Sequence, residues 1–213
     1  MRDEETGSWW QQVTGEAIFG PLKGEHLRPV IEDELSFELW KQEKPQGRVL
    51  RPDEAVERAH NYAPADWEAR MIKVPVTTSQ KVDTALGSRT LVLGVAINGA
   101  SIAYPFEVLL KQSPIIDSVG RTPICLVLGQ DKKSVRAFER VIDGKTLELF
   151  AKQGTSPLRL VDAETGSEWD FGGKAIAGAL VGKQLKQIPV LNDYWFDWKT
   201  YHPDTTIYQL GNR

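Results

Sequence analysis

Residues 162–169 read DAETGSEW, and residues 3–10 read DEETGSWW. Six of the eight aligned pairs are identical. After a one-residue gap the correspondence continues, because residues 15–24 read GEAIFGPLKG and residues 173–182 read GKAIAGALVG. The same offset pairs Leu27 with Leu185, Trp40-Lys41 with Trp198-Lys199, and Pro45 with Pro203. This shared order of glycines and tryptophans predicts duplication of a domain, because two copies this far apart do not stack as short solenoid repeats.

Each copy is expected to fold in the same way locally. A short strand ends at Asp162, residues 163–167 form a turn with Gly166 at positive φ, and Trp169 restarts a strand. Asp162 is expected to accept hydrogen bonds from the amides of the turn. A glycine-rich loop follows, and then a short amphipathic helix. Three residues are predicted as helix caps: Asp33 in the first copy, and Asn192 or Asp193 in the second.

The middle of the chain contains helix signals followed by strand signals. Residues 52–61 and 66–71 are predicted to be short helices. Two hairpins are predicted, one from 90–97 to 100–104 around Asn98-Gly99 and one from 135–142 to 145–150 around Asp143-Gly144. Residues 123–128 read PICLVL, which is typical of a buried strand that contains Cys125. The predicted fold is α+β, a mainly antiparallel sheet with short helices and an internal duplication.

Composition excludes several classes of protein. The net charge of −3 over 213 residues gives no basic face for nucleic acid. The longest apolar run, residues 91–97, is too short to span a bilayer, and the first residues lack the pattern of a signal peptide. The single cysteine cannot form an intrachain disulfide or a cysteine-based zinc site.

Two further blocks of sequence carry a family resemblance. Residues 94–99 read GVAING and residues 103–105 read AYP, followed by Asp117, Gly120 and Pro123. The second block is the motif at 162–169, followed by Ala175-Ile176-x-Gly178, Trp198 and His202-Pro203. In these residues the chain resembles a bacterial and archaeal family catalogued as domain of unknown function 3179. The resemblance implies three regions: residues 1–50 as the C-terminal part of a first copy, 51–71 as a helical connector, and 72–213 as a nearly complete second copy.

The chain departs from the family pattern at two places. Many members carry a Cys-Pro-x-Cys-like motif after the strand that matches residues 123–128, but residues 129–132 read GQDK here. Members also often carry a His-Glu pair where residues 111–117 read KQSPIID. If the family's chemistry uses those groups, this copy has lost it. Met1 matches a position inside the family motif, which predicts a truncated gene or an internal start, with an extracytoplasmic location for a longer form.

The repeated acidic turn supplies the candidate binding residues. They are Asp162, Glu164, Thr165, Ser167 and Trp169, with Asp3, Glu5 and Trp10 in the first copy. The carboxylates are suited to a cation or to acid–base work, but alternating acidic residues before a glycine also form ordinary turns, and this one lacks the further oxygen ligands of a calcium loop. None of the three histidines recurs between the copies, so we expect no metal site and no cofactor, and no catalytic residue is assigned.

The sequence leaves three functions open. The leading hypothesis is a non-catalytic structural or binding module with degenerate family motifs, because no set of catalytic residue types is duplicated. The first alternative is a metal-binding protein or hydrolase-type enzyme that uses the Asp162/Glu164 turn. The second is carbohydrate or peptide binding through exposed residues among the seven tryptophans. A small molecule or another protein is the expected ligand, and the first copy is expected to pack against the second.

Overall fold

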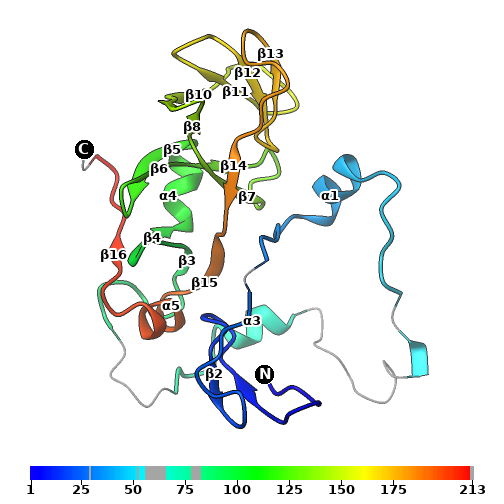
Figure 1. Cartoon of the computed structure of the whole chain (residues 1–213), viewed down its shortest axis with the longest axis vertical. Coiled ribbons are helices and arrows are strands. Elements are labelled where there is room, and N and C mark those ends of the chain that lie inside the picture. Colours follow the sequence, from blue (N-terminus) through cyan, green and yellow to red (C-terminus); the bar gives the residue numbers. More distant parts are fainter. Residues whose placement is uncertain (29, 52, 56–65, 78–82, 212–213) are drawn as a thin grey trace.

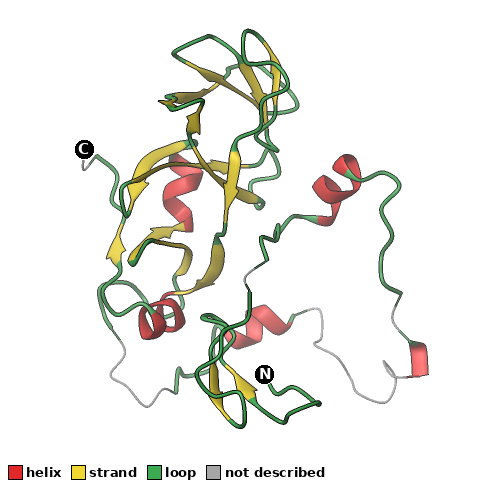
Figure 2. Cartoon of the chain, in the orientation of Figure 1, coloured by secondary structure: helices red, strands yellow, loops and turns green. Residues whose placement is uncertain are grey.

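The computed structural model describes residues 1–211 except 29, 52, 56–65 and 78–82. Figures 1 and 2 show several small β-sheets connected by short helices and long loops. All strand pairings but one are antiparallel within the described residues, which confirms the predicted α+β class with mainly antiparallel sheet. No helix in this part of the chain is long and apolar enough to cross a membrane.

The central sheet has four antiparallel strands. In order they are β14 (Lys186–Ile188), β7 (Val135–Glu139), β6 (Thr122–Leu128) and β5 (Ile115–Val119). Strand β6 is buried on both faces, because Ile124 and Leu126 belong to one core cluster and Cys125 and Val127 to another. A strand covered on both sides needs apolar residues at every position, which explains the unbroken apolar run and confirms that Cys125 is buried.

A second sheet covers one face of the central sheet. It consists of β15 (Leu191–Tyr194), β3 (Leu91–Ile97), β4 (Ala100–Pro105) and β16 (Thr206–Ile207), of which β16 runs parallel to β4. The β3–β4 hairpin turns at Asn98 (φ 52°) and Gly99 (φ 78°), as predicted for a type I′ turn. Helix α4 (Phe106–Lys111) adds Val108 and Leu109 to the core between the two sheets.

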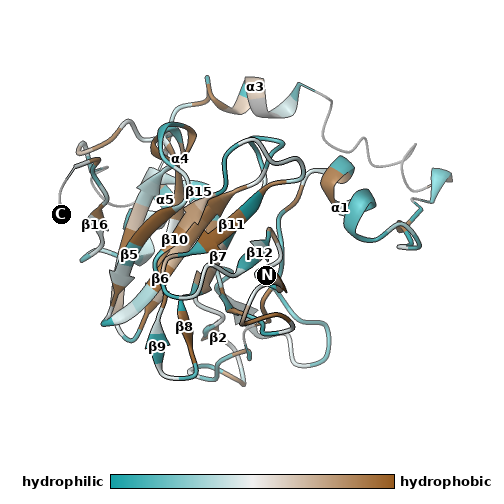
Figure 3. Ribbon diagram, turned by 90° about the horizontal axis from the view of Figure 1, so that it is seen from above, coloured by the Kyte–Doolittle hydropathy of each residue, from teal (hydrophilic) through white to brown (hydrophobic). Residues whose placement is uncertain are grey.

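The other face of the central sheet packs against a third sheet. Its strands are β10 (Leu149–Ala151), β11 (Arg159–Asp162), β12 (Glu168–Asp170) and β13 (Ala175–Ala177). Phe138, Leu149 and Trp169 share the core cluster between them. Figure 3 shows hydrophobic segments along the central strands, where these layers meet.

Helix α5 (Trp195–Tyr201) covers the outer face of the second sheet with its two tryptophans. A Cβ added to Gly94 on β3 would lie 2.2 Å from the Trp198 ring. Glycine at this position therefore lets the indole lie flat against the strand. Trp195 and Trp198 lie three residues apart on one face of the helix, and both side chains are buried in the core, each 1% exposed.

The N-terminal region forms a smaller unit. Strands β1 (Trp9–Trp10) and β2 (Ala17–Phe19) pair with each other, and helices α1 (Phe37–Glu43) and α3 (Trp67–Met71) follow. Leu39 of α1 joins the core cluster under the third sheet, and the Ser36 peptide N–H donates to Ser134 Oγ at 2.9 Å. The region thus packs against the rest of the chain through α1. Helix α3 was predicted, whereas the predicted helix over 52–61 lies largely outside the described residues.

Both predicted helix caps were wrong. Ser36 caps α1 by accepting a hydrogen bond from the Leu39 N–H at 3.3 Å, while Asp33 lies earlier in the chain and pairs with Arg136. Asn192 and Asp193 lie in β15, whose pairing with β3 keeps the backbone extended as far as Tyr194. Helix α5 therefore starts without a side-chain cap.

The second predicted hairpin is shorter than expected. Its turn is correct, with Asp143 at φ 49° and Gly144 at φ 77°. Only β8 (Val141–Ile142) and β9 (Lys145–Thr146) pair across it, however. Strand β7 pairs instead within the central sheet and β10 within the third, because each buries apolar side chains there. Strand β5 was missed altogether.

Candidate functional site

The C-terminal acidic turn is a closed hydrogen-bond network. Asp162 Oδ1 accepts from the Thr165 N–H at 2.6 Å and the Thr165 hydroxyl at 2.8 Å, and Oδ2 accepts from the Trp169 indole at 2.9 Å. Thr165 Oγ1 lies 2.7 Å from Ser167 Oγ, which accepts from the Leu180 N–H at 3.0 Å. Both oxygens of a carboxylate that is 1% exposed therefore hold the turn to the tryptophan.

The N-terminal acidic turn repeats this network. Asp3 Oδ1 accepts from the Thr6 N–H at 2.6 Å, and Oδ2 accepts from the Trp10 indole at 2.8 Å. Thr6 Oγ1 lies 2.7 Å from Ser8 Oγ, which accepts from the Leu22 N–H at 3.2 Å. The Trp10 indole, followed by the Thr6 N–H, lowers the pKa of Asp3 to about 2.

The loops that follow the two turns also match. Gly20 and Gly178 adopt φ of 102° and 89°, and a Cβ on either would lie within 2.7 Å of the Cα of the facing serine, Ser8 or Ser167. Both positions therefore require glycine. The helices end alike, because the Lys44 N–H donates to Trp40 O and the His202 N–H donates to Trp198 O with nearly the same backbone angles. The two segments thus share the geometry of the turn, of the glycine loop and of the helix end. They differ before the helix, because residues 191–194 form β15 whereas the matching residues 33–36 form no strand.

The predicted site residues Asp3, Glu5 and Trp10 line a small groove of about 340 Å³ together with Arg2, whereas Glu164 is exposed on its turn. Glu164 accepts from the Glu148 peptide N–H at 3.0 Å, while Glu5 has no hydrogen-bond partner in the described part of the chain. No three histidine, cysteine, aspartate or glutamate side chains of the described residues come together as a metal site. The His202 ring lies tilted by 32° against the Trp198 ring with 3.9 Å between the centroids, and burial lowers the pKa of His202. His26 is exposed, and His60 lies outside the described residues.

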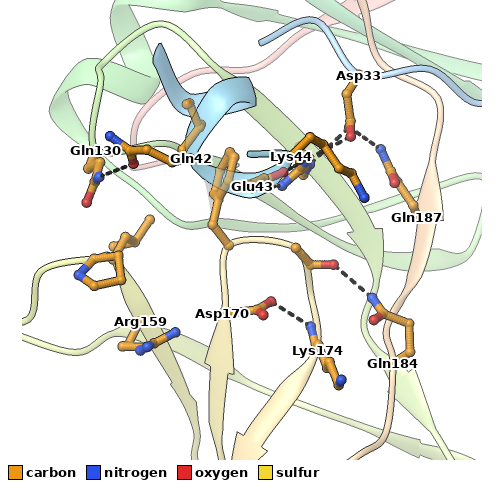
Figure 4. Close-up of a pocket in the computed structure, with 16 residues that line it drawn as sticks. Asp33, Gln42, Glu43, Lys44, Gln130, Arg159, Asp170, Lys174, Gln184 and Gln187 are labelled. Atoms are coloured by element: carbon orange, nitrogen blue, oxygen red, sulfur yellow. Dashed lines mark hydrogen bonds and ion pairs between the residues drawn. The ribbon is translucent and has the colours of Figure 1, made fainter. Parts of the chain in front are cut away.

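A larger cleft lies between α1 and the third sheet, and we call it the Arg136 cleft. Figure 4 shows polar side chains from both sides pointing into it. Its volume is about 730 Å³. Arg136 of β7 lies at its base with a side chain that is 6% exposed. The guanidinium donates to Asp33 at 2.7 and 3.0 Å and to Glu43 at 2.7 and 2.8 Å, and it lies 4.8 Å from the Phe171 ring centroid.

We call Arg136 with its partners Asp33 and Glu43 the Arg136 clamp, and Arg136 and Asp33 stay charged in it. The hydrogen bond from Arg136 lowers the pKa of Asp33 more than burial raises it. Burial lowers the pKa of Arg136, but the bonds to Glu43 and Asp33 outweigh it and keep the guanidinium charged. A buried charge with two partners of opposite sign holds the N-terminal segment on the β-sheet core.

Other cations of the Arg136 cleft are available to a ligand. Lys44, Arg159 and Lys174 line it, and none makes a side-chain hydrogen bond or ion pair within the described residues. Gln42 and Gln130 face each other across the cleft at 3.5 Å, a weak bond that leaves both amides free to turn. The lining contains no serine, threonine, cysteine, histidine or tyrosine. This arrangement is suited to binding a polar anion.

Sequence reasoning missed the Arg136 cleft, although one signal was present. Arg136 lies two residues before Phe138 in a strand, so both side chains point to the same face. A charge at a core-facing position requires a partner, because charged residues are almost never buried unpaired. The partners Asp33 and Glu43 are about one hundred residues away in sequence, and no local pattern identifies them.

Comparison with known families gives one match. Residues 1–205 match the family model described as "Protein of unknown function (DUF3179)". No curated protein and no solved structure matches the chain.

Proposed function

The chain belongs to the DUF3179 family of proteins of unknown function, and we propose that it is a non-catalytic binding module whose ligand site is the Arg136 cleft. The observation that carries this proposal is the buried Arg136 clamp. It fixes α1 above the third sheet and so keeps open a cleft of about 730 Å³. A preformed cleft with few, well-placed polar groups is the usual setting of a small-molecule site.

The charge of the cleft favours a small anion. Its acidic groups are already engaged, because Asp33 and Glu43 pair with Arg136 and Asp170 Oδ1 accepts from the Lys174 N–H at 2.9 Å. Arg159 and Lys174 of the third sheet region line the same space as Lys44, which follows α1 and whose charge also helps to lower the pKa of Asp33. A ligand with a carboxylate or phosphate group and neighbouring hydroxyls would satisfy both these cations and the glutamine amides.

The repeated acidic turns are, in this proposal, structural. In Asp162 and in Asp3, one carboxylate oxygen accepts from the turn and the other accepts from the tryptophan indole. A cation would have to displace those hydrogen bonds. The alternative of a metal-binding protein or hydrolase-type enzyme at Asp162/Glu164 therefore has no geometric support beyond the residue types. The tryptophan alternative is limited to Trp9 and Trp67, whose side chains are 47% and 45% exposed.

Isothermal titration of the full chain with citrate, D-glucuronate and inorganic phosphate at low salt tests the proposal. We expect at least one probe to bind with a dissociation constant on the order of 0.1–1 mM. The double variant Arg159→Ala/Lys174→Ala should weaken binding about tenfold or more. Lys23→Ala/Lys145→Ala is the matched control, since it removes two exposed cations elsewhere on the chain.

Three results would overturn the proposal. The first is the absence of binding by all three probes, and the second is equal binding by the two double variants. The third is activity at the acidic turn, seen as a stoichiometric metal ion in the purified protein or as turnover of an ester or glycoside that Glu164→Gln abolishes.

A further inference from the structure

The base of the Arg136 cleft contains a hydrogen-bond donor without an acceptor. A guanidinium group carries five N–H donors in one plane. Asp33 accepts from Nε and Nη2 along one edge of Arg136, and Glu43 accepts from Nη1 and Nη2 along the next. These four bonds leave the second N–H of Nη1, on the third edge, without an acceptor among the described residues. Because the Arg136 side chain is only 6% exposed, this donor lies almost entirely within the protein.

Glycine at position 172 keeps the space beside this donor open. A Cβ added to Gly172 would lie 3.9 Å from Arg136 Nη1, and no other atom of the guanidinium would be closer to it. The backbone does not require glycine here, because the φ of Gly172 lies outside the left-handed region. Gln184 Nε2 donates to Gly172 O at 2.8 Å and holds the residue in place. The missing side chain therefore gives the cleft access to Nη1.

An acceptor lies next to this donor. The same added Cβ would lie 3.2 Å from Asp170 Oδ1, which accepts from the Lys174 N–H at 2.9 Å. The other oxygen of Asp170, Oδ2, accepts no hydrogen bond from the part of the chain that the structure describes. A ligand oxygen beside Gly172 can therefore reach both an unused N–H and an unused carboxylate oxygen.

The charges around this point favour a hydroxyl over an anionic oxygen. The Arg136 clamp carries one positive and two negative charges, and Asp170 adds a third carboxylate. A carboxylate or phosphate oxygen placed here would face an excess of negative charge. A hydroxyl can accept from Arg136 Nη1 and also donate to Asp170, whereas an ionised carboxylate cannot donate.

The anionic group of a ligand has a separate place in the cleft. Arg159 lies opposite Asp170 in the pairing of β11 with β12, and it lines the cleft together with Lys174. Figure 4 shows both cations on the same side of the cleft as Asp170. Leu158 and Phe171 also line the cleft, and such apolar groups are suited to the C–H groups of a sugar ring. The lining thus matches a ring that carries both hydroxyls and one carboxylate.

We propose that the Arg136 cleft selects a sugar acid. One ring hydroxyl of the ligand lies beside Gly172, where it accepts from Arg136 Nη1 and donates to Asp170. The carboxylate of the ligand pairs with Arg159 and Lys174. This inference rests on the proposed function and adds the ligand class and the groups that recognise the hydroxyl. A ligand without that hydroxyl binds more weakly, because the buried donor then stays unpaired.

Isothermal titration of the full chain with D-glucuronate and with cyclohexanecarboxylate tests the role of the hydroxyl. Both compounds carry one carboxylate on a six-membered ring, and only glucuronate carries hydroxyls. We expect glucuronate to bind about tenfold more tightly or better. Gly172→Val places a side chain beside Nη1 and should weaken glucuronate about tenfold or more. Gly87→Val is the matched control, since Gly87 also lies outside the left-handed region and does not line the cleft.

A second variant separates hydroxyl recognition from simple attraction between charges. Asp170→Asn removes a repelling charge, so it should strengthen the binding of cyclohexanecarboxylate. The same change should weaken glucuronate, because the amide is a poorer acceptor for the hydroxyl than the carboxylate. Opposite effects on the two compounds are therefore expected, and a thermal melt of each variant verifies that it is folded.

The outcomes distinguish this inference from the proposed function. Equal binding of the two ring acids, unchanged glucuronate binding in folded Gly172→Val, or tighter glucuronate binding in Asp170→Asn would overturn the inference and leave the small-anion site standing. Binding of citrate or phosphate without any binding of glucuronate would do the same. If none of these anions binds to the unchanged chain, the proposed function fails and the inference fails with it.

Discussion

The two acidic turns use the same hydrogen bonds in different surroundings. Asp162 and Asp3 bind their turn and their tryptophan with distances that agree within about 0.1 Å. Asp162 and Trp169 of the C-terminal turn are 1% and 0% exposed, whereas Asp3 of the N-terminal turn is only partly buried and Trp10 is 9% exposed. A local network therefore specifies the shape of a turn without specifying how deeply it is buried.

The residues that the two turns share are structural, and the proposed binding site lies elsewhere. Residues that recur in both repeats, such as the aspartate, the threonine and the tryptophan, build the turn in each. The Arg136 cleft lies instead outside both turns, where α1 meets the third sheet.

Asp162→Ala should have the largest effect. It leaves the Trp169 indole and the Thr165 N–H without their acceptor inside the core, which should lower the free energy of unfolding by about 3–5 kcal/mol. Asp3→Ala breaks the same bonds at an exposed turn and should alter only residues 1–27. Denaturant unfolding with hydrogen exchange distinguishes them. If Asp3→Ala lowered the free energy of unfolding as much as Asp162→Ala, this prediction would be wrong.

Arg136→Ala should release the N-terminal segment. It leaves Asp33 and Glu43 unpaired next to the core, which should cost about 2–3 kcal/mol, less than for a fully buried pair because both carboxylates are partly exposed. Limited proteolysis should then cut between residues 33 and 43. Arg48→Ala, an exposed arginine, is the control, and unchanged protection of α1 in Arg136→Ala would rule out the clamp.

Low pH should weaken the same clamp. The pKa of Asp33 in the folded chain lies below its ordinary value of 3.8. The contribution of its ion pair to stability is therefore fully present above about pH 4 and is lost as the pH falls through the folded pKa. Hydrogen exchange of α1 should therefore accelerate below about pH 4 while β6 stays protected. Exchange of α1 that did not respond to acid would count against the clamp.

At β15 the effect of pH on stability should be smaller and of opposite sign. Burial, followed by the charge of Asp197, raises the pKa of Asp193 to about 6, and one Asp193 oxygen is buried without a partner. A raised carboxyl pKa means that stability falls as the pH rises from about 4 to about 6. Asp193→Asn should remove this loss and raise stability at pH 7 by about 1 kcal/mol or less, since the carboxylate is half-buried. Thermal melts of the unchanged chain and of Asp193→Asn at pH 4 and pH 7 measure this difference. A melting temperature of Asp193→Asn below that of the unchanged chain at pH 7 would contradict the prediction.

Much of the fold was predictable because its signals are local. The Asn98-Gly99 hairpin, the buried strand around Cys125 and the turn at Asp162 each depend on a few adjacent residues. The errors have a common cause, which is strand pairing between residues far apart. Residues Leu191–Tyr194 form a strand because they pair with β3. Strand β10 does not continue the predicted hairpin because it pairs with β11 instead. The Arg136 cleft was missed for the same reason, since its ion pairs join residues about one hundred positions apart.

The most direct test of the comparison is hydrogen exchange of the two tryptophan indoles that donate to the aspartates. Their N–H signals appear in a separate region of an NMR spectrum, where the chain's seven tryptophans can be assigned by substitution. The account predicts that the Trp169 indole exchanges only on global unfolding, and that the Trp10 indole is protected to a smaller extent, through local opening. A Trp169 indole that exchanges as fast as a free one would contradict the account, because Asp162 would then not hold it.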